Sequence, residues 1–295
     1  DNEKLRHRIA NTTDKSTLNL SSSELKDRDM EIVAKELEIN RSLTKLRLFT
    51  NQISDIGAQH LADALRMNTK IEPQIRKINE IPYTNPQLTQ LISNNINSAT
   101  IDFSSKNLND QDMKIVASEL LQVNKTLTRL DLYTNQIGDS GAQYLGEALK
   151  TNKSLTLLQL QTNQIGDSGA QYLADALKVN KSLQHLQLQT NQIGDGGAQY
   201  LADGLKANKS LTYLDIGNNK IGDNGAQHIA EGLKVNKNLT QLYLGINQIS
   251  DNGAQLFAEV LKTNKTLTQL ALNENKITDN GAQQLAEALK TNKVN

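Results

Sequence analysis

Residues 127–154 read LTRLDLYTNQIGDSGAQYLGEALKTNKS, and residues 155–182 repeat the pattern as LTLLQLQTNQIGDSGAQYLADALKVNKS. The same unit recurs every 28 residues, with its first leucine at Leu127, Leu155, Leu183, Leu211, Leu239 and Leu267. A further clear copy begins at Leu43 and runs to Lys70. A fixed period of this length predicts a solenoid, because each unit must stack on its neighbours to bury its apolar face.

Each unit opens with L-x-x-L-x-L, which alternates near its end as a short strand does. Leu130 and Leu132 are expected to point to one side, and Arg129, Asp131 and Tyr133 to the other. An asparagine follows each strand, and its amide can bond the backbone of its own and the neighbouring turn. These asparagines could equally be simple turn-formers, but their recurrence in register favours a stacked ladder. The column comprises Asn51, Asn135, Asn163, Asn191, Asn219, Asn247 and Asn275.

The second half of each unit reads as a helix. Ile137 is expected to fill the core below the asparagines, and Asp139 or Ser140 is expected to be the helix N-cap. The helix is expected to end at Asn152, a residue type that tolerates a left-handed conformation after a helix. Its expected buried face comprises Ala142, Leu145, Ala148 and Leu149.

The combined pattern L-x-x-L-x-L-x-x-N-x-I-x-D-x-G-A-x-x-L-A-x-A-L-x-x-N resembles the 28-residue, ribonuclease-inhibitor-like class of leucine-rich repeats. That class includes ribonuclease inhibitors, the sensor arms of NOD-like receptors and Ran GTPase-activating proteins. The resemblance covers about two thirds of the chain and implies an α/β horseshoe solenoid, with parallel strands on the concave side and α-helices on the convex side. The motif is specific for the fold and says little about function.

The repeats are regular only in the second half of the chain. TLNLSSSELKDRDMEIVAKEL at 17–37 lines up with TIDFSSKNLNDQDMKIVASEL at 100–120, so a first-repeat variant occurs twice. The expected organisation is an N-terminal flank at 1–14, two N-terminal repeats at 15–70, a non-canonical helical unit or hinge at 71–97, a divergent repeat at 98–126 and six regular repeats at 127–294.

The segment 71–97 contains all three prolines and lacks the strand signature. Pro73 and Pro82 bracket one expected helix, and a second is expected from Pro86 to about Asn94. The segment either closes a short first array as a hinge or is a degenerate unit inside one continuous solenoid. Its length keeps the phase and favours continuity, whereas its lost strand positions favour interruption.

Composition excludes several functional classes. Lysine plus arginine equals aspartate plus glutamate at 32 each, which gives no bulk charge for nucleic acid or an anionic membrane. The four histidines are scattered and no phosphate-binding loop occurs, so we expect no enzyme activity, no cofactor, no metal site and no small-molecule substrate. The absence of cysteine and the many N-x-S/T sequences favour a cytoplasmic location. The missing initial methionine and the missing polar capping repeat suggest part of a larger protein.

A protein-recognition surface is expected on the concave face. The helix and turn positions barely change between units, whereas the third, fifth and seventh strand positions change greatly. The alternative is that these positions are merely unconstrained, but tyrosine, phenylalanine and arginine gather there and such residues dominate interfaces. Tyr213 and Tyr243 should lie close together with Asp215 beside them. The expected partner-binding residues are Arg47, Phe49, Arg129, Asp131, Tyr133, Gln159, Gln161, His185, Gln187, Tyr213, Asp215 and Tyr243.

Three functions fit this sequence. The first is a non-enzymatic scaffold that binds a macromolecular partner, a protein, on its concave face. The second is a stoichiometric regulator of an enzyme or small GTPase, as inhibitor or GTPase activator, although the neutral composition counts against capture of a basic enzyme. The third is a consensus-like scaffold without natural function, against which the irregular segment 71–97 argues.

Overall fold

The computed structural model describes residues 84–292 and, before them, residues 5, 6, 9, 17–21, 23–39, 45–48, 51, 53, 57, 60, 61 and 64. The chain divides into two compact units, Asp1–Thr84 and Asn85–Asn295. Residues 71–83, and with them the helix expected between Pro73 and Pro82, lie outside the described residues. The helix expected from Pro86 is observed as α4 (Pro86–Asn94).

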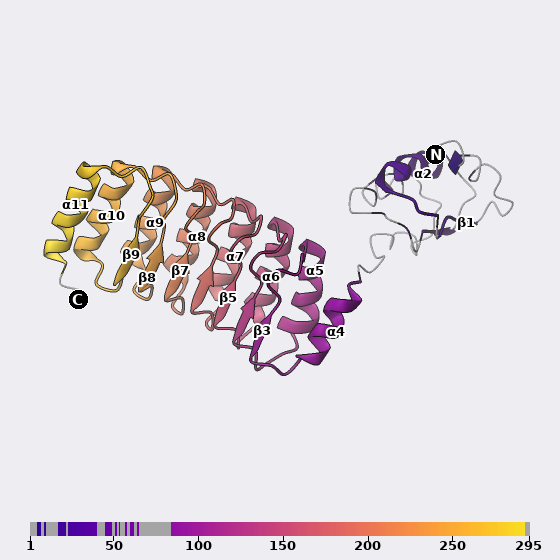
Figure 1. Ribbon diagram of the computed structural model, residues 1–295, viewed down its shortest axis with the longest axis horizontal. Coiled ribbons are helices and arrows are strands. Elements are labelled where there is room, and N and C mark those ends of the chain that lie inside the picture. Colours follow the sequence, from indigo (N-terminus) through magenta and orange to yellow (C-terminus); the bar gives the residue numbers. More distant parts are fainter. Residues whose placement is uncertain are drawn as a thin grey trace. The chain divides into compact units, whose positions relative to one another are not determined.

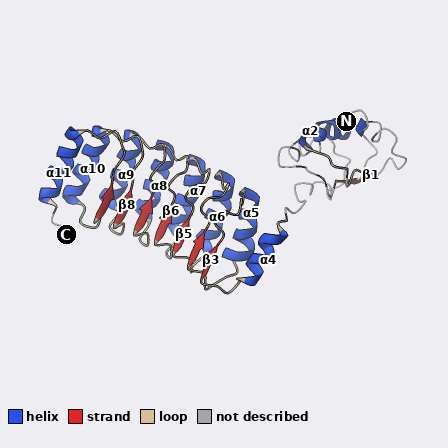
Figure 2. Cartoon of the chain, in the orientation of Figure 1, coloured by secondary structure: helices blue, strands red, loops and turns tan. Residues whose placement is uncertain are grey.

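The second unit is a stack of βα repeats with strands on one side and helices on the other (Figure 1, Figure 2). Its strands form one parallel sheet in consecutive order from β3 to β9. The strands are β3 (Thr100–Asp102), β4 (Arg129–Asp131), β5 (Leu157–Gln159), β6 (His185–Gln187), β7 (Tyr213–Asp215), β8 (Gln241–Tyr243) and β9 (Gln269–Ala271). The helices are α5 (Asp110–Ile115), η2 (Val116–Leu121), α6 (Asp139–Thr151), α7 (Asp167–Val179), α8 (Asp195–Ala207), α9 (Asp223–Val235), α10 (Asp251–Thr263) and α11 (Asp279–Thr291).

The first unit shows the same construction in its described part. β1 (Thr17–Asn19) pairs in parallel with β2 (Lys45–Arg47), and α2 (Asp27–Ile39) lies between them in the chain. The Asn51 amide donates to the carbonyls of Leu20 and Leu48, at 2.9 and 2.7 Å. This is the bonding that the asparagine column predicted.

The asparagine ladder continues through the second unit. Asn163 Nδ2 donates to the carbonyls of Leu132 and Leu160, and its Oδ1 accepts from the Ile137 N–H, all at 3.0 Å. One side chain therefore joins two consecutive repeats. The residue before Asn163, Thr162, has a positive φ of 58°.

Two expectations about the helix ends were wrong. Asp139 and Ser140 are not the N-cap: α6 begins at Asp139, and Gly138 caps it without a side-chain bond. Asn152 is extended rather than left-handed, with φ −68° and ψ 133°. Its amide is buried and donates to the Leu121 carbonyl of the preceding repeat at 2.8 Å. In the regular repeats the left-handed residues lie instead just after the strands, at Thr134, Thr162, Thr190, Asn218, Ile246 and Glu274, and the divergent repeats have left-handed residues at Glu24, Ser105 and Asn107.

The divergent repeat contains one extra residue. Thr100 on β3 pairs with Arg129 on β4, an offset of 29 residues, whereas Arg129 pairs with Leu157 at an offset of 28. The extra residue is absorbed in η2, a π-helix in which the Gln122 N–H donates to the Ala117 carbonyl five residues earlier. The sheet register is thereby kept. In front of this repeat, α4 packs Leu88 and Ile92 into the core, and Asn85 donates to the Asp112 carboxylate at 2.7 Å.

Candidate protein-binding surface

The variable strand positions lie together on the open face of the seven-stranded sheet, which we call the strand face. His185 pairs with Tyr213 across β6 and β7, and Asp215 pairs with Tyr243 across β7 and β8. The leucines between them in the sequence, such as Leu186 and Leu214, are buried on the other side. The predicted alternation is therefore observed. Phe49 and the side chain of Arg47 lie outside the described residues.

Arg129 and Asp131 form a closed ion pair at the N-terminal end of this face. Arg129 Nη2 lies 3.0 Å from Asp131 Oδ2, and Arg129 Nε donates to both carboxylate oxygens at 3.0 Å. Burial raises the pKa of Asp131, and the guanidinium opposes that rise. Asp131 is only 4% exposed, so it is less accessible than its strand position suggested. Tyr133 is half-buried on the same face.

The middle of the strand face is polar, as expected. Gln159 Nε2 donates to Gln187 Oε1 at 2.9 Å, which links β5 to β6. The amide oxygens of Gln161 and Gln189 are buried, and no described residue donates a hydrogen bond to them.

An aromatic row crosses the next three strands. The rings of His185 and Tyr213 are 5.5 Å apart, and those of Tyr213 and Tyr243 are 5.1 Å apart, all half-buried. Such separations are typical of favourable ring pairs. The Tyr243 hydroxyl donates to Gln269 Oε1 at 2.7 Å and fixes the ring orientation. The prediction that Tyr213 and Tyr243 lie close together, with Asp215 beside them, is confirmed.

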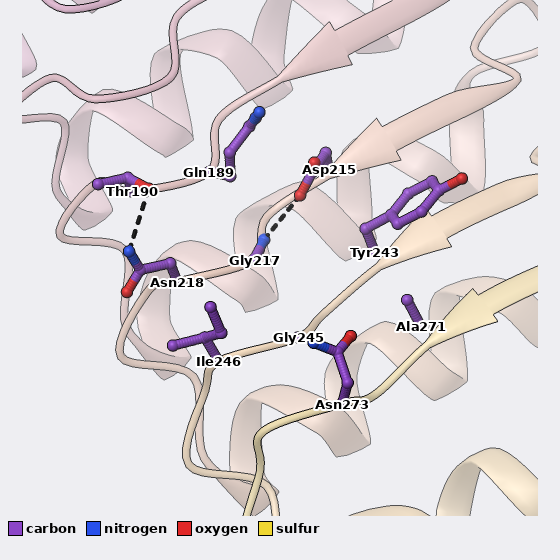
Figure 3. Close-up of a pocket in the computed structure, with 10 residues that line it drawn as sticks. All are labelled: Gln189, Thr190, Asp215, Gly217, Asn218, Tyr243, Gly245, Ile246, Ala271 and Asn273. Carbon is purple, nitrogen blue, oxygen red and sulfur yellow. Dashed lines mark hydrogen bonds between the residues drawn. The ribbon is translucent and has the colours of Figure 1, made fainter.

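Beside this row is an open pocket of about 240 Å³ that we did not predict from the sequence (Figure 3). Gly217 and Gly245 line it at the seventh strand position, where the three preceding regular repeats have Tyr133, Gln161 and Gln189. Asp215 and Tyr243 line its upper side in Figure 3, and Asn273 lies next to Gly245. Glycine occupies the seventh position in two consecutive repeats, where most regular repeats have a larger side chain, and this was the sequence signal for the pocket.

The carboxylate of Asp215 is the charged group of the pocket. Its Oδ1 accepts a 2.9 Å hydrogen bond from the Gly217 N–H. Burial raises the pKa of Asp215, and the bonds from Gly217 and the Tyr213 side chain only partly oppose it. Burial, with the charges of Asp215 and then Tyr243, also raises the pKa of Tyr213 to about 12. The pocket therefore contains a partly desolvated acid, and Tyr213, which stays protonated, lies next to that acid outside the pocket lining.

Ile246 adds an apolar group to the rim of the pocket. It is 44% exposed and has a φ of 56°, a conformation that is unfavourable for a β-branched residue. Asn218, which tolerates this conformation, occupies the same position one repeat earlier. An exposed isoleucine at such a position is not explained by packing.

The helical face offers a weaker candidate. The sequence places Tyr144, Tyr172, Tyr200 and His228 in one column of the helices, a pattern that favours stacking between neighbouring helices over a second binding stripe. Tyr144 packs against the core and Tyr200 is 36% exposed. Within the described residues, ring contacts are found in the aromatic row of the strand face and not in this column.

Neither a metal site nor a membrane-spanning helix is found among the described residues. No group of three or more histidine or carboxylate side chains there could hold a metal ion. Nor does any helix in that part of the chain have the length and apolar character needed to cross a membrane.

Repeated strands, helices and asparagine ladders define a leucine-rich-repeat solenoid. The leucine-rich-repeat family model matches residues 40–62, 123–146, 151–174, 179–202, 207–230, 235–258 and 263–286, more than half of the chain. The chain belongs to the leucine-rich-repeat family. Its period and its one α-helix per repeat are consistent with the ribonuclease-inhibitor-like class.

Similar solved structures are distant. The actin-binding site 2 of leiomodin-1 is 17% identical, with 70% of this chain and 86% of that chain covered at a TM-score of 0.38. An internalin from Listeria monocytogenes strain 4b F2365 is 19% identical, with 97% and 92% covered at a TM-score of 0.39. No curated protein sequence matches the chain.

Proposed function

We propose that this chain is a non-enzymatic scaffold that binds a protein partner on its strand face. Its membership of the leucine-rich-repeat family supports an interaction scaffold. The observation that favours the strand face is the aromatic row His185–Tyr213–Tyr243 beside the glycine-lined pocket. Tyrosines held by neighbours on a rigid sheet lose little side-chain entropy on binding, which makes them effective interface residues.

The contrast between framework and surface supports the same proposal. The asparagine ladder and the leucine core are nearly identical in every regular repeat, whereas the strand-face residues differ. A scaffold that varies only where its side chains reach solvent is suited to recognition rather than to chemistry. The expected partner is a protein rather than a nucleic acid or an anionic membrane, because the net charge is zero.

Affinity capture with the whole chain tests this function. Tyr213→Ala and Tyr243→Ala are expected to reduce partner recovery at least tenfold, because truncation at an interface hot spot costs about 2 kcal/mol or more. Tyr172→Ala and Tyr200→Ala on the helical face are the matched controls and are expected to retain the partner. Recovery that survives both strand-face substitutions but is lost with Tyr172→Ala would place the interface on the helices.

A further inference from the structure

Two aspartates at the same strand position have different charge environments. Asp131 and Asp215 both occupy the fifth position of a repeat, on β4 and β7. Asp131 has Arg129 two residues earlier and is bound by that guanidinium at 3.0 Å. Asp215 has Tyr213 at the equivalent place. Among the described residues no salt bridge reaches Asp215, and the pocket lining contains no lysine or arginine.

The charge of Asp215 has no counter-ion among the described residues, and this raises the free energy of the folded state. A carboxylate that loses water on folding is destabilised unless hydrogen bonds or a cation replace that water. Here the Gly217 N–H supplies one hydrogen bond, at 2.9 Å, and the Tyr213 side chain supplies another, but no cation does so among the described residues. The rest of the cost is relieved when a positive group enters the pocket.

The volume and the lining of the pocket favour one kind of cation. Its volume of about 240 Å³ lies below the range of about 300–1,000 Å³ that is usual for small-molecule sites, and it is open to solvent. It therefore suits one side chain of a larger partner. The Tyr243 ring packs against Tyr213 with the ring centres 5.1 Å apart, is held by its bond to Gln269, and lies beside the carboxylate. A planar guanidinium can stack on such a ring while it bonds a carboxylate, which an ammonium group does less well.

We propose that the pocket formed by Asp215, Gly217, Tyr243 and Gly245 receives an arginine side chain of the protein partner, with Asp215 as its counter-ion. This inference rests on the proposed function and specifies the partner's chemistry. The incoming guanidinium takes the place at Asp215 that Arg129 takes at Asp131. The Ile246 side chain at the rim is then available to the apolar part of the arginine or to its neighbours.

A short peptide tests the pocket without knowledge of the partner. The probe is Ac-Gly-Arg-Gly-NH2, titrated into the whole ¹⁵N-labelled chain, with the Gly217 and Gly245 amide resonances as the readout. The control probe replaces arginine with citrulline, which has a similar shape and no charge. Asp215→Asn is the test variant, and Asp131→Asn is the matched control because Asp131 already has its own guanidinium.

We expect the arginine peptide to cause a saturable shift of the Gly217 and Gly245 amide resonances. Binding should weaken at least about tenfold with citrulline and with Asp215→Asn, since a hydrogen bond to a charged group contributes about 1.5–3 kcal/mol. Asp131→Asn should leave it unchanged. Equal shifts with both peptides, persistence in Asp215→Asn, or no shift at Gly217 and Gly245 would each overturn the arginine site.

The peptide result and the capture result are independent. If the strand face captures a protein but the arginine peptide leaves Gly217 unmoved, the arginine pocket is wrong and the proposed function stands. If the peptide binds through Asp215 but partner recovery ignores Tyr213→Ala and Tyr243→Ala, the strand-face function is wrong. A separate variant, Gly245→Gln, copies the side chain found at Gln161 and Gln189. Its Cβ would lie 2.6 Å from Asn273 Oδ1, so Asn273 must move as the glutamine enters the pocket, and the Gly217 shift with the peptide should be abolished.

Discussion

The carboxylate of Asp139 accepts a 2.9 Å hydrogen bond from the backbone N–H of Gly169, thirty residues later in the next repeat. The same oxygen accepts from the Gly166 N–H at 2.7 Å. Asp139 therefore caps the N-terminus of α7, the helix of its neighbour, rather than its own. The relation is repeated along the stack, and the accepting aspartates include Asp110, Asp139, Asp167, Asp195, Asp223 and Asp251.

Loss of one such cap should destabilise the stack. Asp139→Ala leaves the Gly166 and Gly169 N–H groups without their acceptor, and a lost N-cap costs about 0.5–2 kcal/mol. Asp175→Ala is the control because Asp175 forms only an exposed pair with Lys178, which is worth about 0.5 kcal/mol or less. Urea unfolding followed by circular dichroism measures both. Equal losses in the free energy of unfolding for the two variants would show that the inter-repeat cap stabilises the fold no more than an exposed ion pair does.

Gly169 is required by the same contact. A Cβ at this position would lie 2.7 Å from Asp139 Oδ1 and 2.7 Å from Ile165 Cγ2, closer than side-chain carbons approach other atoms. Gly169→Ala should therefore displace the carboxylate and cost at least as much as Asp139→Ala, about 1–3 kcal/mol by overpacking. Gly196→Ala is a useful comparison because its Cβ meets only the end of the Asp167 side chain. A neutral Gly169→Ala in urea unfolding would contradict the observed packing.

The sequence allowed prediction of the fold because its period, its leucines and its first asparagine column each report local geometry. The predicted closeness of Tyr213 and Tyr243 followed from the same period, although the residue that pairs with Tyr243 across the strands is Asp215. The caps were mispredicted because a capping rule applied within one helix cannot see an aspartate of the previous repeat. The pocket was missed because a glycine in the sequence shows only that a side chain is lacking. Only the structure shows that an open pocket lies beside Gly217 and Gly245.

Acid should weaken the inter-repeat caps near the C-terminal end. Bonds from the Thr278 side chain and N–H lower the pKa of Asp251. For Asp223 burial opposes the change, but bonds from Ser250 and Gly253 lower its pKa overall. A carboxyl with a lowered folded-state pKa stabilises fully above its unfolded value of about 3.9, and that stability is lost as the pH falls through the folded value.

The matched variant for this acid effect is Ser250→Gly, since glycine holds the same place in earlier repeats, as at Gly222. It removes the hydroxyl donor to Asp223 and keeps the backbone donor. The urea midpoint of the native chain should fall between pH 5 and pH 3, and Ser250→Gly should fall less. Asp215, whose pKa is raised by burial, has the opposite sign and favours folding as it is protonated. A urea midpoint that rises on acidification would mean that carboxyls with a raised pKa, such as Asp215, determine the pH dependence of stability.

Ile246→Asn should stabilise the chain and weaken its binding. Asparagine tolerates the left-handed conformation that Ile246 adopts, so the substitution relieves about 1 kcal/mol of strain. It also removes the exposed apolar group from the pocket rim, so partner recovery should fall. Thr162→Asn is the control: it lies at the same position three repeats earlier, away from the pocket, and should raise the melting temperature without altering recovery. If both variants lower stability, the strain at these positions is not relieved by asparagine.

Stability should decline toward α11. Leu205 in α8 is fully buried, whereas Leu289, at the same position in α11, is 56% exposed because its described neighbour is α10 alone. Leu205→Ala should cost about 2–5 kcal/mol, as expected for a core leucine, and Leu289→Ala less than about 1 kcal/mol. Hydrogen exchange should follow the same order, with the α11 amides exchanging through local opening and the α8 amides through opening of the larger stack. Equal protection of α8 and α11 would instead mean that the repeats of this unit unfold as one cooperative body.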